Sequence, residues 1–267
     1  MTTPDPVTAS SPVAVVTGGA RGIGLAIAHW FLDHGHRVAL LDIDETTLQR
    51  SAAALGRPDA VLAVHADVRD PTQVGAGIAN VVAKFGRIDK LVNNAGIAVF
   101  KPVMQTSYAE FRDVLNTNLD GAFLCTQACV PPMLKAGGGA IVNICSISGL
   151  RASTLRVAYG TSKAALLHMT KQLAVELGDV GIRVNAICPG PVETEMAKLV
   201  HSVAIRSDYH DAIPLGRYGT PEEMANAVGF LCSADASFIN GQFLAVDGGF
   251  DAAGVGLPTL RRNAAAK

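Results

Sequence analysis

Short runs of apolar residues, many of them β-branched, recur along the chain and are separated by amphipathic stretches. The runs lack the strict alternation of apolar and polar positions that a half-exposed strand shows, so we expect strands covered on both faces of a parallel sheet. Seven such strands are predicted at residues 13–17, 37–41, 60–64, 88–92, 140–145, 183–187 and 242–246. Apolar positions with a period near 3.6 predict helices at residues 22–34, 45–55, 71–85, 118–135, 158–177 and 221–232. The alternation predicts a doubly wound, Rossmann-like α/β fold with helices on both faces of a seven-stranded parallel sheet.

The length of 267 residues suits a single domain of this class, and no internal repeat or linker interrupts the pattern. We place that domain at residues 12–250, after a flexible N-terminal tail at residues 1–11. The C-terminal tail, residues 251–267, is expected either to reach a neighbouring subunit or to be disordered. The longest stretch without a strand follows a strand end, where α/β folds bind ligands, so we expect a lid around residues 190–217.

The charge balance and the apolar content exclude several classes of partner. Lys and Arg number 22 and Asp and Glu number 23, so the net charge is 22 − 23 = −1, without a basic surplus for nucleic acid or an anionic membrane. No run of 18 apolar residues occurs, and the N-terminus lacks the pattern of a signal peptide. The five cysteines lack the paired spacing of a zinc site. We therefore expect a soluble, cytoplasmic protein with buried thiols and no metal.

A glycine-rich turn joins the first predicted strand to the first predicted helix. It reads Gly18-Gly19-Ala20-Arg21-Gly22-Ile23-Gly24, with the spacing G-x-x-x-G-x-G. Glycine lets phosphate oxygens approach the backbone N–H groups and the helix N-terminus, which a Cβ atom would prevent. We therefore assign Gly18, Arg21, Gly22, Ile23 and Gly24 to the binding of a dinucleotide. A tight turn with a purely structural purpose is the alternative.

An acidic residue follows this turn at a suitable distance. Asp42 ends the second predicted strand eighteen residues beyond Gly24, close to the spacing of about twenty at which a carboxylate accepts hydrogen bonds from an adenosine ribose. A 2′-phosphate 4 Å from this carboxylate would be repelled by about 4 kcal/mol at an effective dielectric constant of 20, so we expect NAD rather than NADP, with Ile43 also in the cofactor site. Two alternatives remain open. Arg21 could bind a 2′-phosphate, and Asp42 could cap a helix, although Asp44 suits the capping role better.

Tyr159 and Lys163 stand four residues apart, in Tyr-Gly-Thr-Ser-Lys, at the start of a predicted helix. Residues at i and i+4 share one helix face, so the phenol and the ammonium are expected to lie side by side. The ammonium and a nicotinamide cation would both favour the phenolate, which makes this tyrosine a usable acid/base. Taken alone, the pair also fits an ordinary surface helix.

The combination of these features resembles the short-chain dehydrogenase/reductase family in its compact, single-domain form. The resemblance covers about residues 12–250. The residues that carry it are Thr17 to Gly24, Asn93-Asn94-Ala95-Gly96, Ser146, the Tyr159 and Lys163 pair, and Pro189-Gly190. It implies hydride transfer between a nicotinamide cofactor and a secondary alcohol or its ketone. It also implies a homotetramer whose subunits pack through the last strand.

The same resemblance assigns four catalytic residues. Tyr159 would be the general acid/base, and Ser146 would hydrogen-bond the substrate oxygen. Lys163 would hold the nicotinamide ribose and favour the phenolate, while Asn118 would hold a water molecule beside this lysine in a proton relay. Ser148 and Asn116 are local rivals for the roles of Ser146 and Asn118.

The cofactor contacts that the resemblance implies lie after the predicted strands. Asp67 and Val68 would contact the adenine, and Pro189, Gly190, Val192 and Thr194 would orient the carboxamide. The segment Asn94, Ala95 and Gly96 would support the sheet and line the adenosine side, and Tyr159 and Lys163 would complete the nicotinamide end.

Substrate choice is expected to depend on residues 149–158 and on the lid. Arg151, Arg156, His201 and Arg206 could meet an anionic or polyhydroxylated substrate, but each also fits a solvated charge, so none is assigned to the site. Sugars, polyols and small diols are the favoured substrates by analogy. The alternatives are an NADP-dependent ketone or 3-oxoacyl reductase and, from another class, a non-catalytic dinucleotide-binding regulatory protein.

Overall fold

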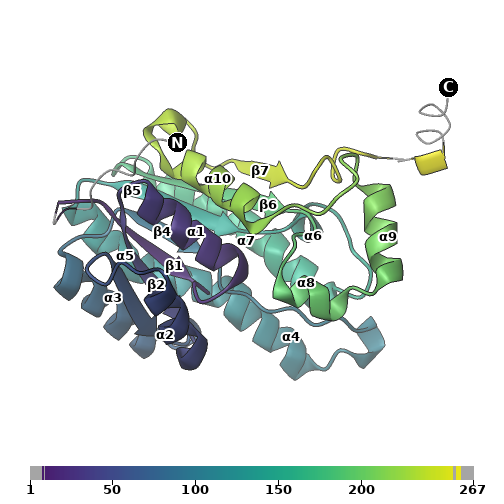
Figure 1. The fold of residues 1–267 in the computed structure, drawn as a ribbon, viewed down its shortest axis with the longest axis horizontal. Coiled ribbons are helices and arrows are strands. Elements are labelled where there is room, and N and C mark those ends of the chain that lie inside the picture. Colours follow the sequence, from purple (N-terminus) through teal and green to yellow (C-terminus); the bar gives the residue numbers. More distant parts are fainter. Residues whose placement is uncertain (1–7, 9, 255–256, 260–267) are drawn as a thin grey trace.

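A computed structural model describes residues 8, 10–254 and 257–259 of the chain. Its centre is a sheet of seven parallel strands (Figure 1). The strands are β1 (Val13–Thr17), β2 (Arg37–Asp42), β3 (Val61–His65), β4 (Lys90–Asn93), β5 (Gly139–Ile144), β6 (Ile182–Pro189) and β7 (Phe243–Val246). Their order across the sheet is β3-β2-β1-β4-β5-β6-β7. The order changes direction between β1 and β4, and folds of this class bind ligands at such a switch point.

Side chains alternate along β1 and pack into two separate layers. Ala14 and Val16 belong to one buried cluster, with apolar residues of three helices. Val13 and Val15 belong to the cluster on the other face. The first layer uses α1 (Gly22–Asp33), α2 (Glu45–Ala54) and α10 (Pro221–Cys232), and the second uses α3 (Pro71–Phe85), α5 (Gly121–Lys135) and α7 (Val157–Leu177). The predicted doubly wound sheet is therefore confirmed.

The expectation of full coverage is wrong for the outermost strand on one side. Phe243 and Leu244 of β7 are 45% and 43% exposed, because this strand has a partner only on its β6 edge. The central strand β1, in contrast, is buried throughout. Apolar composition alone did not distinguish the edge strand from the buried ones.

The region before α5 differs from the single helix expected to begin at residue 118. The chain forms α4 (Tyr108–Leu115), then a π-helical turn η2 (Asn116–Asp120), and only then α5. A short 3₁₀ turn, η1 (Val103–Gln105), precedes α4. The helix α6 (Ile147–Leu150) was not predicted. The helices α8 (Glu195–Val200) and α9 (Val203–Ala212) lie in the long strand-free stretch where helical segments were expected without bounds, and a 3₁₀ turn, η3 (Ala234–Ala236), follows α10.

The helices α8 and α9 lie within the segment expected to form the lid, beyond the carboxyl end of β6 (Figure 1). Ala197 of α8 is buried with Ile213 and Tyr218, and Tyr209 of α9 packs against this cluster. Most of the two expected tails, residues 1–7, 9, 255–256 and 260–267, lies outside the described residues. Within the described part of the chain, no helix has both the length and the apolar character needed to cross a membrane.

Candidate active site

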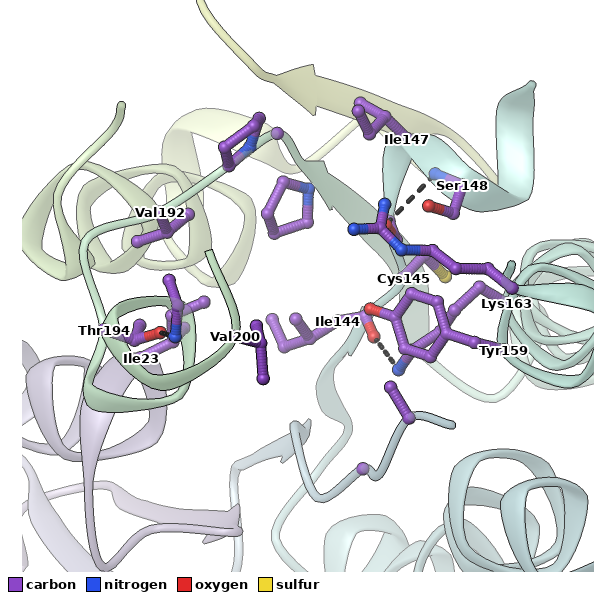
Figure 2. A pocket seen from close by; sticks show the side chains of 18 of the residues that line it. Ile23, Ile144, Cys145, Ile147, Ser148, Tyr159, Lys163, Val192, Thr194 and Val200 are labelled. Atoms are coloured by element: carbon purple, nitrogen blue, oxygen red, sulfur yellow. Dashed lines mark hydrogen bonds between the residues drawn. The ribbon is translucent and has the colours of Figure 1, made fainter. Parts of the chain in front are cut away.

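A pocket of about 220 Å³ opens at the carboxyl ends of β4, β5 and β6 (Figure 2). Residues from α1, from α7 and from the lid segment complete its walls. The predicted site residues that line it are Ile23, Asn94, Gly96, Ser146, Tyr159, Lys163, Pro189, Gly190, Val192 and Thr194. The fold thus gathers Ser146, Tyr159, Lys163 and the predicted carboxamide-side residues into one pocket, whereas Asn118 is not among the residues that line it. Of the residues predicted for the adenosine side, Asn94 and Gly96 also line this pocket, while Asp42, Ile43, Asp67 and Val68 lie at or after the ends of β2 and β3.

The turn after β1 has the shape that a pyrophosphate requires. Gly22 has a φ of +54°, which L side chains rarely adopt, and a Cβ on Gly24 would lie 2.2 Å from the Gly18 carbonyl oxygen. The helix α1 then begins at Gly22, and the Arg21 side chain at its N-cap makes no capping hydrogen bond. Since no side chain caps this end, the first-turn N–H groups can bind an anion. The residues present therefore fit the phosphates of a dinucleotide.

Asn94 and Ala95 hold this turn in place through Thr17. The Asn94 amide donates from Nδ2 to the carbonyl oxygens of Thr17, at 2.9 Å, and Gly18, at 3.0 Å. The Thr17 hydroxyl oxygen accepts from the backbone N–H groups of Asn94 and Ala95, each at 3.0 Å. The loop after β4 is therefore hydrogen-bonded to the loop after β1. Thr17 positions both loops, a role that the sequence analysis did not predict, since it named Thr17 only as part of the glycine-rich motif.

Asp42 lies at the end of β2, beside the glycine-rich turn. Its carboxylate accepts from the Ala20 N–H and from the Asp44 N–H, both at 3.0 Å. Asp44 caps α2, as predicted, by accepting from the Thr47 N–H, and it also forms an ion pair with Arg21 at 2.5 Å. The Arg21 side chain is 60% exposed, so the guanidinium lies at the rim of this region.

Ile43, Asp67 and Val68 lie at the same edge of the sheet. Ile43 is 57% exposed. The Asp67 carboxylate is already engaged, since the Arg69 guanidinium donates two hydrogen bonds to its Oδ2, at 2.9 and 2.7 Å, and these bonds lower the pKa of Asp67. Val68 is buried against Gly121, where an added Cβ would come within 2.7 Å of the valine side chain.

The predicted pairing of Tyr159 and Lys163 is present in the first turns of α7 (Figure 2). Lys163 is only 4% exposed, and its Nζ lies 5.8 Å from the centre of the Tyr159 ring. The ammonium donates one hydrogen bond, of 2.8 Å, to the Ile144 carbonyl oxygen at the end of β5. An ammonium has three N–H groups, so this bond anchors the lysine and leaves it capacity for a ligand.

Asn118 sits in the π-helical turn and is 1% exposed. Its side-chain amide accepts from the Ile97 N–H at 2.8 Å and donates to the Ile97 carbonyl and the Ser162 hydroxyl, each at 3.0 Å. A Cβ on Gly96 would lie 3.1 Å from Asn118 Oδ1 and 3.5 Å from Lys163 Nζ. A side chain at position 96 would therefore crowd the asparagine and contact the lysine, so glycine suits this position.

Asn116, the rival of Asn118, has a different environment. Its side-chain oxygen accepts a hydrogen bond of 3.1 Å from Arg112, one turn earlier in the chain. Neither asparagine lines the pocket among the described residues, but Asn118 lies near Gly96 and Ser162. The surroundings of the two asparagines favour Asn118 for contact with the lysine.

Ser146 and Ser148 both line the pocket, as does Tyr159. Ser146 Oγ accepts from the Ser148 N–H at 3.1 Å and so begins the short helix α6. Accepting this bond does not use the serine's own hydroxyl hydrogen, which can still be donated to a substrate oxygen. The Ser148 hydroxyl instead pairs with the Ser153 hydroxyl at 3.0 Å.

The segment after β6 is fixed at both of its ends. The Gly190 N–H donates to the Val246 carbonyl at 3.1 Å, and a Cβ on Gly190 would lie 2.8 Å from the Asp247 backbone. Val192 forms a parallel bridge with Gly219. Thr194 caps α8 by accepting from the Ala197 N–H at 3.2 Å. This segment is therefore held rigidly against the pocket.

Sequence reasoning did not assign several residues that complete the pocket wall. Phe100, Arg156, His201 and Tyr209 line it and come from four separate segments of the chain. Arg156 and His201 stood out only as charges in the predicted substrate region. No local pattern marks Phe100 or Tyr209, because only the tertiary packing brings these segments together.

Comparison with known proteins decides the family. A family model described as "Enoyl-(Acyl carrier protein) reductase" matches residues 18–251 of the chain. The chain is also 44% identical to 2-(R)-hydroxypropyl-CoM dehydrogenase of Xanthobacter autotrophicus, over 91% of this chain and 99% of that protein. The chain belongs to the short-chain dehydrogenase/reductase family.

Other relatives in this family act on varied substrates. The chain is 42% identical to a 3-oxoacyl-[acyl-carrier-protein] reductase of Chlamydia muridarum, over 88% of this chain and 96% of that protein. It is 39% identical to meso-2,3-butanediol dehydrogenase of Serratia marcescens, over 89% and 93% of the respective lengths. The crystal structure of gox2181 superposes with a TM-score of 0.87 and 34% identity, and covers 91% of this chain and 96% of that one.

Membership in the short-chain dehydrogenase/reductase family confirms the predicted family, fold and enzyme class. The protein is an oxidoreductase that acts on hydroxyl or ketone groups of a small molecule, and members of its family bind nicotinamide dinucleotides. Within the described residues, no cluster of His, Cys, Asp and Glu could hold a metal ion.

Proposed function

We propose that the protein is an NAD-dependent oxidoreductase that interconverts a secondary alcohol and its ketone, with Tyr159 as general acid/base. The observation that carries the proposal is the pocket in which Ser146, Tyr159 and Lys163 meet at the carboxyl ends of β5 and β6. Bound NAD would accept the hydride from the carbinol carbon in oxidation, and its reduced form would return it in reduction. The side chains of the pocket then have two tasks, which are to position the substrate oxygen and to transfer one proton.

Tyr159 would take the hydroxyl proton of the alcohol as the C–H bond breaks, and would return it to the ketone oxygen in the reverse direction. Ser146 would donate a hydrogen bond to the same oxygen and so fix its position. Lys163 would hold the nicotinamide ribose beside Tyr159, since its Nζ lies 5.8 Å from the centre of the tyrosine ring. Asn118 and Lys163 would belong to a relay that carries the proton onward through a water molecule.

NAD is proposed as the cofactor because of Asp42. This carboxylate lies at the end of β2, where the adenosine ribose is expected, and its charge opposes a 2′-phosphate. An NADP-dependent 3-oxoacyl reductase is the second candidate, since relatives of that activity are 42% and 41% identical to this chain. The exposed Arg21, which is held by Asp44, is the group that would favour it.

Small diols and polyols are the proposed substrates among the neutral alcohols. The relatives include meso-2,3-butanediol dehydrogenase, and D-threitol dehydrogenase of Mycolicibacterium smegmatis is 41% identical to the chain. Arg156 in the segment 149–158 and the pocket-lining residues of the lid at residues 190–217 are proposed to set this choice. The other residues of 149–158 do not line the pocket among the described residues.

The function is tested by following nicotinamide absorbance during incubation with diols, polyols, hydroxy acids and 3-oxoacyl thioesters, with NAD and NADP side by side. We expect turnover with NAD and a secondary alcohol. Tight NAD binding without turnover of any substrate would instead indicate a regulatory dinucleotide-binding protein. Turnover confined to NADP and 3-oxoacyl thioesters would favour the second candidate.

We also propose a homotetramer, built partly on the exposed edge of the sheet. Phe238 is fully exposed, and Phe230 of α10 is 42% exposed, close in sequence to the half-exposed β7. An apolar edge strand of this kind is a ready surface for pairing with another chain. Light scattering should give a mass of about four times 27.7 kDa. A monomer at micromolar concentration would contradict the proposal.

A cytoplasmic location is proposed from the thiols. The five cysteines are free and buried, which suits a reducing compartment. Cell fractionation decides the question, and recovery in a secreted fraction would refute it.

A further inference from the structure

One cation lines the pocket without a place in the proposed proton path. Arg156 immediately precedes α7, and Tyr159 is the third residue of that helix. Both residues line the same pocket. The walls around the reaction are otherwise rich in apolar side chains, among them Ile97, Ala98, Phe100, Ile147, Ala197 and Val200.

The guanidinium of Arg156 is positioned by aromatic residues. Its Nη2 donates to the Tyr209 hydroxyl at 3.0 Å, and its Cζ lies 5.0 Å from the centre of the Phe100 ring. The Nε atom is buried and has no hydrogen-bond partner among the described residues. A buried N–H without a hydrogen-bond partner costs free energy, so the protein satisfies this guanidinium only in part.

Arg156 also lacks the carboxylate or carbonyl partners that two neighbouring arginines have. Arg206 forms an ion pair with Glu193, and Arg151 donates to the carbonyl oxygens of Phe250, at 2.6 Å, and Asp251, at 3.3 Å. No ion pair to Arg156 occurs within the described part of the chain, so its charge is left uncompensated beside an apolar wall. A partly buried cation in this state attracts an anion strongly.

A nearby histidine also lines this part of the pocket, but it does not provide a second positive charge for an anion. His201 lines the pocket and pairs with the Tyr218 hydroxyl at 3.1 Å. Burial, and after it the positive charges of Arg156 and Arg206, lower the pKa of His201. The histidine is therefore neutral near pH 7, and Arg156 supplies the positive charge at this wall.

We propose that Arg156 binds an oxyanion group of the substrate, so that the preferred substrates are secondary alcohols or ketones that carry a carboxylate or sulfonate on a short carbon chain. The planar guanidinium offers two parallel N–H donors, which match the geometry of such a group. Binding the anion at Arg156 would direct the carbinol carbon toward Tyr159. This specificity rests on the proposed alcohol–ketone function and deepens it.

The test compares substrates of equal shape that differ in charge. Oxidation of 4-hydroxypentanoate, 3-hydroxybutane-1-sulfonate and the neutral 4-hydroxypentanamide is measured for the natural protein, Arg156→Gln, Arg156→Lys and Arg151→Gln. We expect kcat/KM for one or both anions to exceed that for the amide by about 100-fold, and Arg156→Gln to reduce this ratio to about threefold or less. The ratio should be partly kept in Arg156→Lys and fully kept in Arg151→Gln. The two anions distinguish a carboxylate from a sulfonate substrate.

A binding measurement separates this proposal from the dehydrogenase function itself. Calorimetry of NADH-loaded protein with butanoate, propane-1-sulfonate and butanamide requires no turnover. We expect at least one anion to bind at least tenfold more tightly than butanamide, and that preference to vanish in Arg156→Gln but persist in Arg151→Gln. Circular dichroism and retained NADH binding establish that the variants are folded. Equal binding of acid, sulfonate and amide, or an anion preference that survives in Arg156→Gln, would overturn the proposal even if the protein oxidises alcohols.

Discussion

Replacing Tyr159 with Phe is expected to lower kcat by about 10³-fold while the dissociation constant for NADH stays within about twofold. Only the oxygen that exchanges the proton is removed, and the ring remains in place at the start of α7. Steady-state kinetics on the best substrate and NADH fluorescence titration measure the two quantities separately. The loss should appear in both kcat and kcat/KM, because the proton transfer is made only in the transition state.

Tyr108→Phe provides the matched control for this prediction. Tyr108 is 78% exposed at the first position of α4, far from the pocket wall, and loses the same atom. Its kinetics should equal those of the natural protein. Retention of more than a tenth of the original kcat in Tyr159→Phe would show that another group moves the proton.

Replacing Asp42 with Asn is expected to shift the cofactor preference toward NADP by about 100-fold in kcat/KM. The carboxylate opposes a 2′-phosphate by about 4 kcal/mol at 4 Å and an effective dielectric constant of 20, and salt screening reduces that value. Asn keeps one oxygen that can accept from the Ala20 or Asp44 N–H, so the turn should keep its shape. The ratio of kcat/KM values for NAD and NADP is the measurement.

The exposed Asp59 supplies the control, since Asp59→Asn removes the same charge at the surface away from the pocket. That variant should keep the natural preference. The prediction would be contradicted if the natural protein already prefers NADP and Arg21→Gln removes that preference. In that case Arg21, rather than Asp42, would determine which cofactor binds.

The sheet was predictable because buried parallel strands leave a strong signal in the sequence. All seven strands occur where apolar runs predicted them, and α3 and α10 have the predicted bounds. The helix α4 was missed, although its start carried a visible signal. Ser107 and Glu110 form a capping box, the S-x-x-E pattern that marks a helix N-terminus.

The π-helical turn could not be read from the local sequence. Its residue Asn118 is held by Ile97, which follows β4, and by Ser162 of α7. Both partners are distant from Asn118 in the sequence. The hydrogen bonds at the π-helical turn are therefore tertiary contacts, which the local sequence does not reveal. The same reason limits the prediction of the substrate wall, where Phe100 meets Arg156 across more than fifty positions.

The fastening of the two loops by Asn94 ties cofactor binding to assembly of the sheet. Its amide joins segments 77 residues apart, so the phosphate cradle exists only after β1 and β4 have paired. A partly folded chain would therefore have no site for the dinucleotide, and the native state alone would gain its binding free energy. At a cofactor concentration 100 times the dissociation constant this gain is about 2.7 kcal/mol. The cell's nicotinamide pool would thus protect the enzyme from unfolding and proteolysis, in addition to serving as its oxidant.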